Sequence, residues 1–163
     1  MNINFAAPAG INYNFEPTGE FKIQCLREVG SVLLDTPQEV KNYLINEVGQ
    51  SIRHCWDKEN FVVLFLDTRK RVIGFEIIAC GILDSVLVHA REVFRPAIVA
   101  NAHSIIVAHN HPTGDPTPST ADIRVTRDLI RAGQMLKLEL VDHVIYTKNG
   151  LHASLKELGQ FYC

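Results

Sequence analysis

The chain has 163 residues, of which 47% are hydrophobic and 21% are charged, and its formal net charge is -2. A chain of this length buries enough apolar surface to fold as one domain without disulfide or zinc staples, so a metal bound here would serve chemistry. The apolar runs are far shorter than the roughly 20 residues that span a bilayer, and the N-terminus lacks a secretory-signal pattern. We therefore expect a cytoplasmic protein that does not contact membranes.

The first 25 residues are expected to be an arm or linker. Up to about residue 20 the stretch favours turns and irregular structure, because it holds Pro8, Gly10, Pro17 and Gly19 among several Asn residues. Residues 26–163 are expected to form the domain. Its first helix begins at the N-cap Thr36, where Glu39 completes a capping box. Its apolar face repeats every four residues, at Val40, Leu44, Val48 and Ile52.

Apolar runs and turn residues predict the remaining elements. Strands are expected at residues 61–66, 72–79, 85–88, 105–108 and 138–146. Helices are expected at about residues 91–101, from the N-cap Ser119 onward, and briefly from a capping box at Ser154 and Glu157. Strands that alternate with helices favour an α/β layer fold in which helices cover the sheet.

His109 and His111 follow a buried strand and are two residues apart, so both imidazoles point to the same side. The helix that begins after Ser119 brings Asp122 back toward this strand end. Two imidazoles and one carboxylate are the protein ligands of a catalytic zinc site, in which the metal lowers the pKa of a bound water to about 7. Spacing leaves alternatives open: Asp115 competes as the third ligand, and Asp122 is also placed to stabilise the helix dipole.

The cysteine spacing and the charge distribution limit which metal sites and which partners we expect. Cys25, Cys55, Cys80 and Cys163 form no CxxC pair, which argues against a structural zinc knuckle. Sixteen Lys and Arg residues against eighteen Asp and Glu residues are scattered without a basic block. Nucleic-acid binding is therefore possible but not favoured, since it would need a local patch that only the fold forms.

The stretch from His109 to Asp122 resembles the JAMM motif, HxHP followed by Ser and Asp, in the form typical of RadC-like JAB/MPN proteins. The resemblance runs from about Leu26 to Gly159 and includes segments 59–67, 81–83, 89–95 and 142–145. It implies an α+β fold similar to that of cytidine deaminases, with a mixed sheet flanked by helices. It also implies that His109, His111 and Asp122 ligate zinc, that Glu59 is the general base and that Ser119 helps to stabilise the oxyanion.

The residues alone leave two of these roles open. Composition offers several candidate bases, namely Glu59, Glu76, Glu92 and Glu139, and only the resemblance singles out Glu59. Ser119 is equally suited to a plain N-cap role. Asp142 and His143 belong to the resemblance as well, but we expect His143 to be at most a hydrogen-bond partner of a ligand.

The resemblance implies a zinc-dependent hydrolase, a metallopeptidase or isopeptidase, with a peptide or protein substrate. The alternatives are an accessory binding protein of DNA repair or mobile elements, and an MPN scaffold without turnover. A zinc deaminase is disfavoured because the sequence has no PCxxC signature. The resemblance is to the C-terminal part of full-length RadC proteins, so we expect no helix-hairpin-helix module. A further hypothesis is that the thiol of Cys80 approaches the metal and inhibits it.

Overall fold

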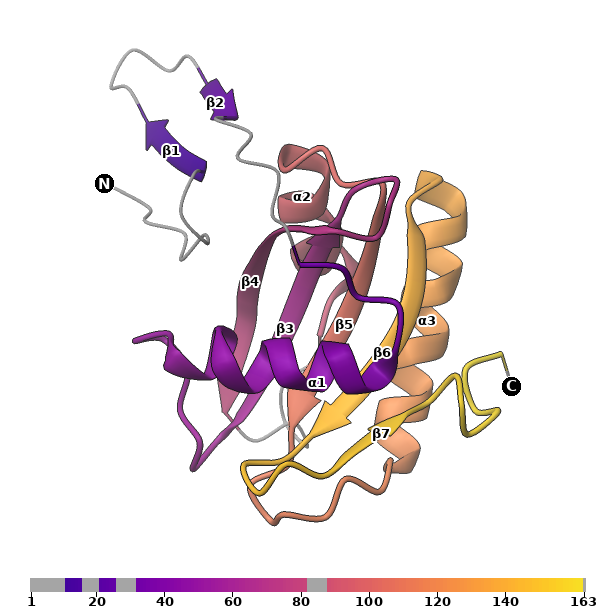
Figure 1. The fold of residues 1–163 in the computed structure, drawn as a ribbon. Helices are drawn as coiled ribbons and strands as arrows, with labels where there is room; N and C mark the ends of the chain where they lie inside the picture. The colour runs from indigo at the N-terminus through magenta and orange to yellow at the C-terminus, as the bar shows by residue number, and fades with distance from the viewer. Residues whose placement is uncertain (1–10, 16–20, 26–31, 82–87, 163) are drawn as a thin grey trace.

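The computed structural model describes residues 11–15, 21–25, 32–81 and 88–162. Its centre is a five-stranded sheet in the order β4-β3-β5-β6-β7. The strands are β3 (Glu59–Leu66), β4 (Val72–Gly81), β5 (Ser104–Asn110), β6 (Glu139–Tyr146) and β7 (His152–Ser154). Only the β5–β6 pair within this sheet is parallel. The α+β fold with a mixed sheet is therefore confirmed (Figure 1).

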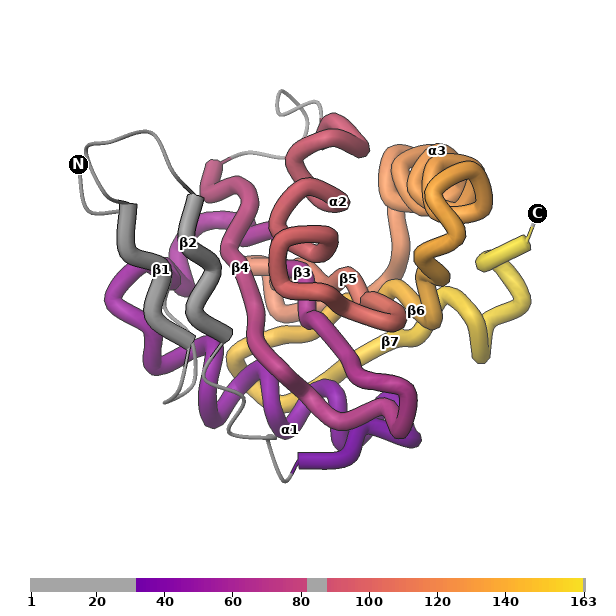
Figure 2. The backbone as a smooth tube through the Cα atoms, turned by 90° about the horizontal axis from the view of Figure 1, so that it is seen from above, coloured from indigo at the N-terminus to yellow at the C-terminus, as the bar shows by residue number. Residues whose placement is uncertain are grey.

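Helices cover both faces of the sheet. Helix α1 (Pro37–Asn46) lies on one face, and α2 (Ala90–Val99) and α3 (Thr120–Leu136) lie on the other (Figure 2). Strands β3 and β5 are buried along nearly their whole length because each is covered on both faces, which explains their unbroken apolar sequences. Alternate residues of β3 enter opposite cores: Val62 and Leu64 pack under α1, and Phe61 and Val63 pack under α2 and α3.

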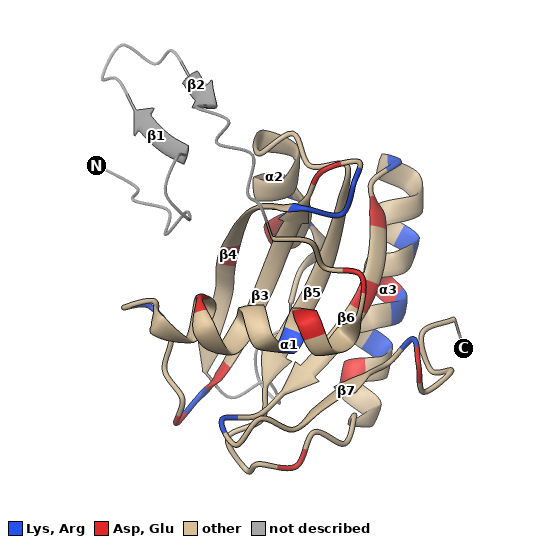
Figure 3. Ribbon diagram, in the orientation of Figure 1, with Lys and Arg blue, Asp and Glu red and all other residues tan. Residues whose placement is uncertain are grey.

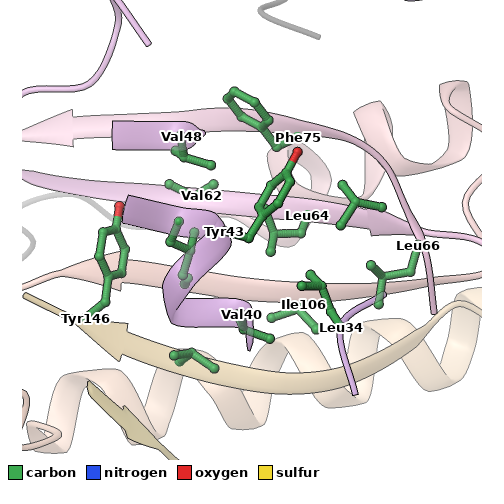
Figure 4. Close-up of a cluster of buried hydrophobic side chains, with 14 of the residues drawn as sticks. Leu34, Val40, Tyr43, Val48, Val62, Leu64, Leu66, Phe75, Ile106 and Tyr146 are labelled. Carbon is green, nitrogen blue, oxygen red and sulfur yellow. The ribbon is translucent and has the colours of Figure 1, made fainter. Parts of the chain in front are cut away.

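Helix α1 begins as the sequence predicts but ends early. The Thr36 hydroxyl accepts a hydrogen bond from the Glu39 N–H, and the Glu39 side chain accepts from the Thr36 N–H. Figure 4 shows how Val40 and Tyr43 of this helix meet the sheet. A short 3-10 turn, Val48–Gln50, follows the helix, and Ile52 is 99% exposed. The predicted extension of the apolar face to Ile52 is therefore wrong.

The backbone after α1 carries Ile52 away from the sheet. The helix ends at Asn46, the 3-10 turn follows, and Ser51 is extended with a ψ of 135°. Gly49 lies in this turn, where a Cβ would lie 2.6 Å from the Trp56 ring, so the packing requires a glycine. The four-residue spacing of apolar side chains continues past this turn in the sequence, whereas the helix does not.

Helix α3 also has a complete capping box at its start. The Ser119 hydroxyl accepts from the Asp122 N–H, and the Asp122 carboxylate accepts from the Ser119 N–H. The helix ends at Lys137, which has a left-handed φ of 56°. The Leu138 N–H then donates to the Gly133 carbonyl oxygen, which leads the chain directly into β6.

Two terminal predictions are corrected. Ile11–Phe15 (β1) pairs antiparallel with Phe21–Cys25 (β2), so the expected irregular structure is wrong for Ile11–Phe15, whose sequence alternates apolar and polar residues with a strand period. Residues 154–157 form no helix: Ser154 ends β7 and a turn follows, in which the Glu157 N–H donates to the Ser154 hydroxyl and the Leu158 N–H donates to the Ser154 carbonyl oxygen. The strand expected at 85–88 lies outside the described residues except for Val88.

None of the described helices is long and apolar enough to span a membrane.

Candidate metal centre

Three side chains that could ligate a metal converge at one end of β5. His109 is on β5, His111 follows the strand, and Asp122 lies in the first turn of α3. Their ligand atoms all lie within 4.8 Å of one another. The two imidazole Nε2 atoms are 3.0 Å apart, and His109 Nε2 is 3.2 Å from Asp122 Oδ1. His111 Nε2 is 3.8 Å from Asp122 Oδ2.

The second nitrogen of each imidazole is held by the protein. His111 Nδ1 donates to the backbone carbonyl oxygen of Asp115 at 2.7 Å. Because a carbonyl oxygen only accepts, the proton of a neutral His111 lies on Nδ1, and its Nε2 carries the lone pair. His109 Nδ1 instead lies 2.8 Å from Nε2 of His143, a fully buried residue on β6. Burial and the neighbouring His109 hold the pKa of His143 well below its usual value.

Asp122 combines helix capping with its place beside the imidazoles. Its Oδ2 accepts from the Ser119 N–H at 2.7 Å and from the Ser119 hydroxyl at 2.6 Å, which turns Oδ1 toward His109. Burial opposes ionisation of this carboxyl group, but His109 and the Ser119 donors outweigh it and hold the pKa of Asp122 well below its usual value. Asp122 is therefore a carboxylate at neutral pH.

These donors fit a zinc ion. Tetrahedral zinc with Zn–N bonds of about 2.0–2.1 Å places neighbouring ligand atoms roughly 3.3–3.4 Å apart. The separations of 3.0 Å between the Nε2 atoms and 3.2 Å from His109 to Asp122 are close to that spacing, and the 3.8 Å from His111 to Asp122 is somewhat longer. Two imidazoles and one carboxylate also form the three-ligand set of catalytic zinc sites.

Glu59 enters the same end of the sheet at the first residue of β3. Phe61 pairs with His109 across the β3–β5 ladder, and their rings stack with centroids 6.2 Å apart. Because side chains alternate along a strand, Glu59 shares a face with Phe61 and therefore with the ligands. The register thus brings the first residues of β3 alongside the end of β5 that carries His109.

A buried amide pair fixes this register. Asn110, between the two histidines, accepts from the Asn60 N–H and from Asn60 Nδ2, both at 2.8 Å. Asn110 Nδ2 donates to the Lys58 carbonyl oxygen at 2.9 Å, and Asn60 Nδ2 donates to the Cys55 and Lys58 carbonyl oxygens. The backbone on both sides of Glu59 is therefore tied to β5.

Comparison with known proteins agrees with this arrangement. A family model described as RadC-like JAB domain matches residues 34–160. The chain belongs to the RadC-like JAB domain family. A UPF0758 protein of Desulfitobacterium hafniense is 44% identical over 127 residues, which cover 78% of this chain and 53% of that protein.

Two further relatives of this JAB domain are also UPF0758 proteins. A UPF0758 protein of Caldanaerobacter subterraneus is 43% identical over 126 residues, covering 77% of this chain and 52% of that protein. A UPF0758 protein of Methanosarcina mazei is 42% identical over 102 residues, covering 63% of this chain and 44% of that protein. The chain thus spans about half the length of the curated relatives that it matches.

The geometry of this JAB domain also separates the alternatives that the sequence left open. The Asp115 carboxylate accepts from the N–H and the hydroxyl of Thr117 and is not part of the ligand group. Glu139 pairs with Ser104, at the opposite end of β5 from the histidines. Glu76 is paired with Arg53, and Glu92 is paired with Arg91.

Cys80 does not join the ligands. It pairs with Asn60 across the β3–β4 ladder, so it lies on the α1 face of the sheet, whereas His109 lies on the α2 and α3 face. Among the residues with described side chains, the group that could hold a metal consists of His109, His111 and Asp122.

Sequence reasoning named His143 as at most a hydrogen-bond partner of a ligand but missed the other supports of the site. The Asn60–Asn110 contact joins residues 50 apart, and Thr126 meets His143 across the gap between α3 and β6. The one available signal was the polar Asn110 inside an otherwise apolar strand, since a buried amide requires hydrogen-bond partners.

Proposed function

We propose that this JAB domain is a zinc-dependent hydrolase of the JAMM type that cleaves a peptide or isopeptide bond in a peptide or protein substrate. The observation that carries the proposal is the convergence of His109, His111 and Asp122 within 4.8 Å, with Glu59 on the same face of the neighbouring strand. Membership of the RadC-like JAB domain family supports it.

The residues have distinct parts in this proposal. His109, His111 and Asp122 would hold a zinc ion, which would supply Lewis acidity toward the scissile carbonyl and a water. Glu59 takes a proton from the attacking water and passes it to the leaving amine. The Ser119 hydroxyl donates to the developing oxyanion; for that it rotates away from Asp122, while its N–H keeps the helix cap.

The first test is metal content. We expect about one zinc per chain in the wild type after exposure to zinc and removal of excess. A folded variant that carries His109→Ala and His111→Ala should retain none. A folded wild type that retains no zinc would refute the proposed metal centre.

The second test is turnover. Zinc-loaded protein is assayed on a panel of fluorogenic peptides and lysine-linked isopeptides, and Glu59→Gln is compared with Glu139→Gln. Glu139 is exposed and lies at the other end of the sheet, so it is a matched control for the loss of one carboxylate. We expect Glu59→Gln to lower kcat by about 100-fold or more and Glu139→Gln to leave it unchanged. Equal rates in the two variants would exclude Glu59 as the base.

Nucleic-acid binding is a second candidate because of one surface feature. Arg124, Arg127 and Arg131 are spaced three and four residues apart on α3 and so share one side of that helix. Figure 3 shows the blue Arg positions along the α3 ribbon and the red Asp and Glu positions on α3 and on other elements. Anisotropy titrations of labelled duplex DNA at increasing salt test this candidate. Salt-dependent binding that the triple Arg→Gln variant loses would support it, and no binding at low salt would exclude it.

A further inference from the structure

A continuous chain of buried polar contacts runs from one ligand to another. His109 Nδ1 lies 2.8 Å from His143 Nε2, and His143 Nδ1 lies 2.5 Å from the Thr126 hydroxyl oxygen. The same hydroxyl lies 2.6 Å from the backbone carbonyl oxygen of Asp122, one helical turn earlier on α3. His109, His143 and Thr126 are all fully buried, so water cannot substitute for any of these contacts.

With both histidines neutral, only one distribution of protons bridges these three contacts. The Asp122 carbonyl oxygen has no proton, so the Thr126 hydroxyl must donate to it. Thr126 then has only lone pairs to offer His143, and therefore His143 Nδ1 carries a proton and donates. A neutral His143 consequently has a bare Nε2, which accepts from a proton on His109 Nδ1. His109 Nε2 is thereby left with its lone pair directed at His111 and Asp122.

The opposite distribution fails at Thr126. If the hydroxyl donated to His143, then Thr126 and the Asp122 carbonyl would face each other at 2.6 Å with lone pairs only. His143 would then donate to His109 and place the remaining proton of His109 on Nε2, the atom that a metal needs. A single hydroxyl proton on α3 therefore determines which nitrogen of His109 is available, two side chains away.

We propose that His143 and Thr126 are positioning residues that hold His109 in the Nδ1–H tautomer and so prepare its Nε2 to bind a metal. The two imidazoles of the site reach this state by different means, since His111 donates to a loop carbonyl instead. The relevance of this His109 tautomer to catalysis rests on the proposed function. The tautomer itself is a property of the metal-free chain and is measured without turnover.

The experiment compares three variants with the wild type. Thr126→Val removes the hydroxyl with little change of shape, and Thr126→Ser keeps it. Thr147→Val is the matched control, because Thr147 is a second fully buried threonine whose hydroxyl contacts Asn149 and Leu151 and none of the groups in the chain of contacts. Ring nitrogens of the metal-free proteins are observed by two-bond proton–nitrogen NMR, and zinc affinity is measured by competition with a chromophoric chelator.

In the wild type and in Thr147→Val we expect His109 and His143 each to carry the proton on Nδ1. Thr126→Val should lose this state and bind zinc about 10- to 100-fold more weakly, and Thr126→Ser should restore both. A wild-type His109 with its proton on Nε2 would overturn the proposal, even if no variant folds. So would a folded Thr126→Val with unchanged tautomers and zinc affinity.

The two proposals fail in different ways. A protein with the expected tautomers and zinc affinity but no hydrolysis of any peptide or isopeptide would refute the proposed function and leave this inference standing. A protein that hydrolyses its substrate with His109 protonated on Nε2 in the metal-free state would refute the inference alone.

Discussion

Replacing Asn110 by alanine should loosen the end of β3 that carries Glu59 without removing any proposed ligand. Asn110 is 1% exposed and lies between His109 and His111 in the sequence, but its side chain points to the opposite face of the sheet. It accepts two hydrogen bonds from Asn60 and donates one to Lys58.

The loss of stability in Asn110→Ala follows from which polar groups keep a hydrogen-bond partner. Asn60 Nδ2 retains the carbonyl oxygens of Cys55 and Lys58, and the Lys58 carbonyl retains Asn60 Nδ2. The main-chain N–H of Asn60, a fully buried residue, loses its acceptor. A buried unsatisfied donor costs about 1–3 kcal/mol, and the lost bond to Lys58 adds roughly 1 kcal/mol. We expect Asn110→Ala to lower the free energy of unfolding by about 2–4 kcal/mol.

Urea denaturation of the metal-free protein at neutral pH measures this loss. The control is Asn42→Ala, because Asn42 is a surface residue of α1 that accepts one hydrogen bond from Gln38. We expect the control to stay within about 0.5 kcal/mol of the wild type. At temperatures where Asn110→Ala remains folded, kcat should fall more than zinc affinity, since Glu59 moves and the ligands do not. Equal stabilities of Asn110→Ala and Asn42→Ala would refute the reasoning.

Three further predictions follow from the described contacts. Gly133→Ala should destabilise the protein by about 1–3 kcal/mol in urea denaturation, despite the helix propensity of alanine, because a Cβ would lie 2.6 Å from the Leu138 carbonyl oxygen; a more stable variant would contradict this. Burial lowers the pKa of His54 to about 4 from an ordinary 6.5, so the unfolded chain binds the extra proton between these values. Stability should therefore be complete above pH 6.5 and fall as the pH drops toward 4, and denaturation across this range should show a flatter profile for His54→Gln than for the wild type. Ser119→Ala should cost about 1 kcal/mol as a lost N-cap and Ser119→Thr much less, in thermal or urea unfolding of the metal-free chain; equal losses would argue against the cap.

Features encoded within a few residues could be predicted from the sequence. The caps at Thr36 and Ser119 depend on side chains three positions apart, and both are present in the structure. The pair His109 and His111 and the return of Asp122 depend on one strand end, one loop and one helix start. Each of these short-range patterns has few geometric solutions, so the sequence determines it almost alone.

Predictions failed where residues outside a pattern ended it. Ser154 has the pattern of a capping box and its hydroxyl accepts from the Glu157 N–H, but only a turn follows, and Gly159 has a left-handed φ of 70°. Ile52 continues an apolar repeat, but the helix ends at Asn46 and the chain is extended at Ser51. Such outcomes depend on residues that the local pattern does not contain.

The alternation of β5 connects the metal centre to the rest of the protein. His109 faces α2 and α3, where His143 fixes its second nitrogen, and Asn110 faces α1, where it ties down the backbone around Glu59. His111 lies beyond the strand, where the Asp115 carbonyl oxygen orients it. Three successive residues, His109, Asn110 and His111, therefore include two proposed metal ligands and position the proposed base. This arrangement requires an inner strand with both faces covered, because an edge strand or a strand with one face in water would leave the tautomer of His109 or the register of Glu59 to the solvent.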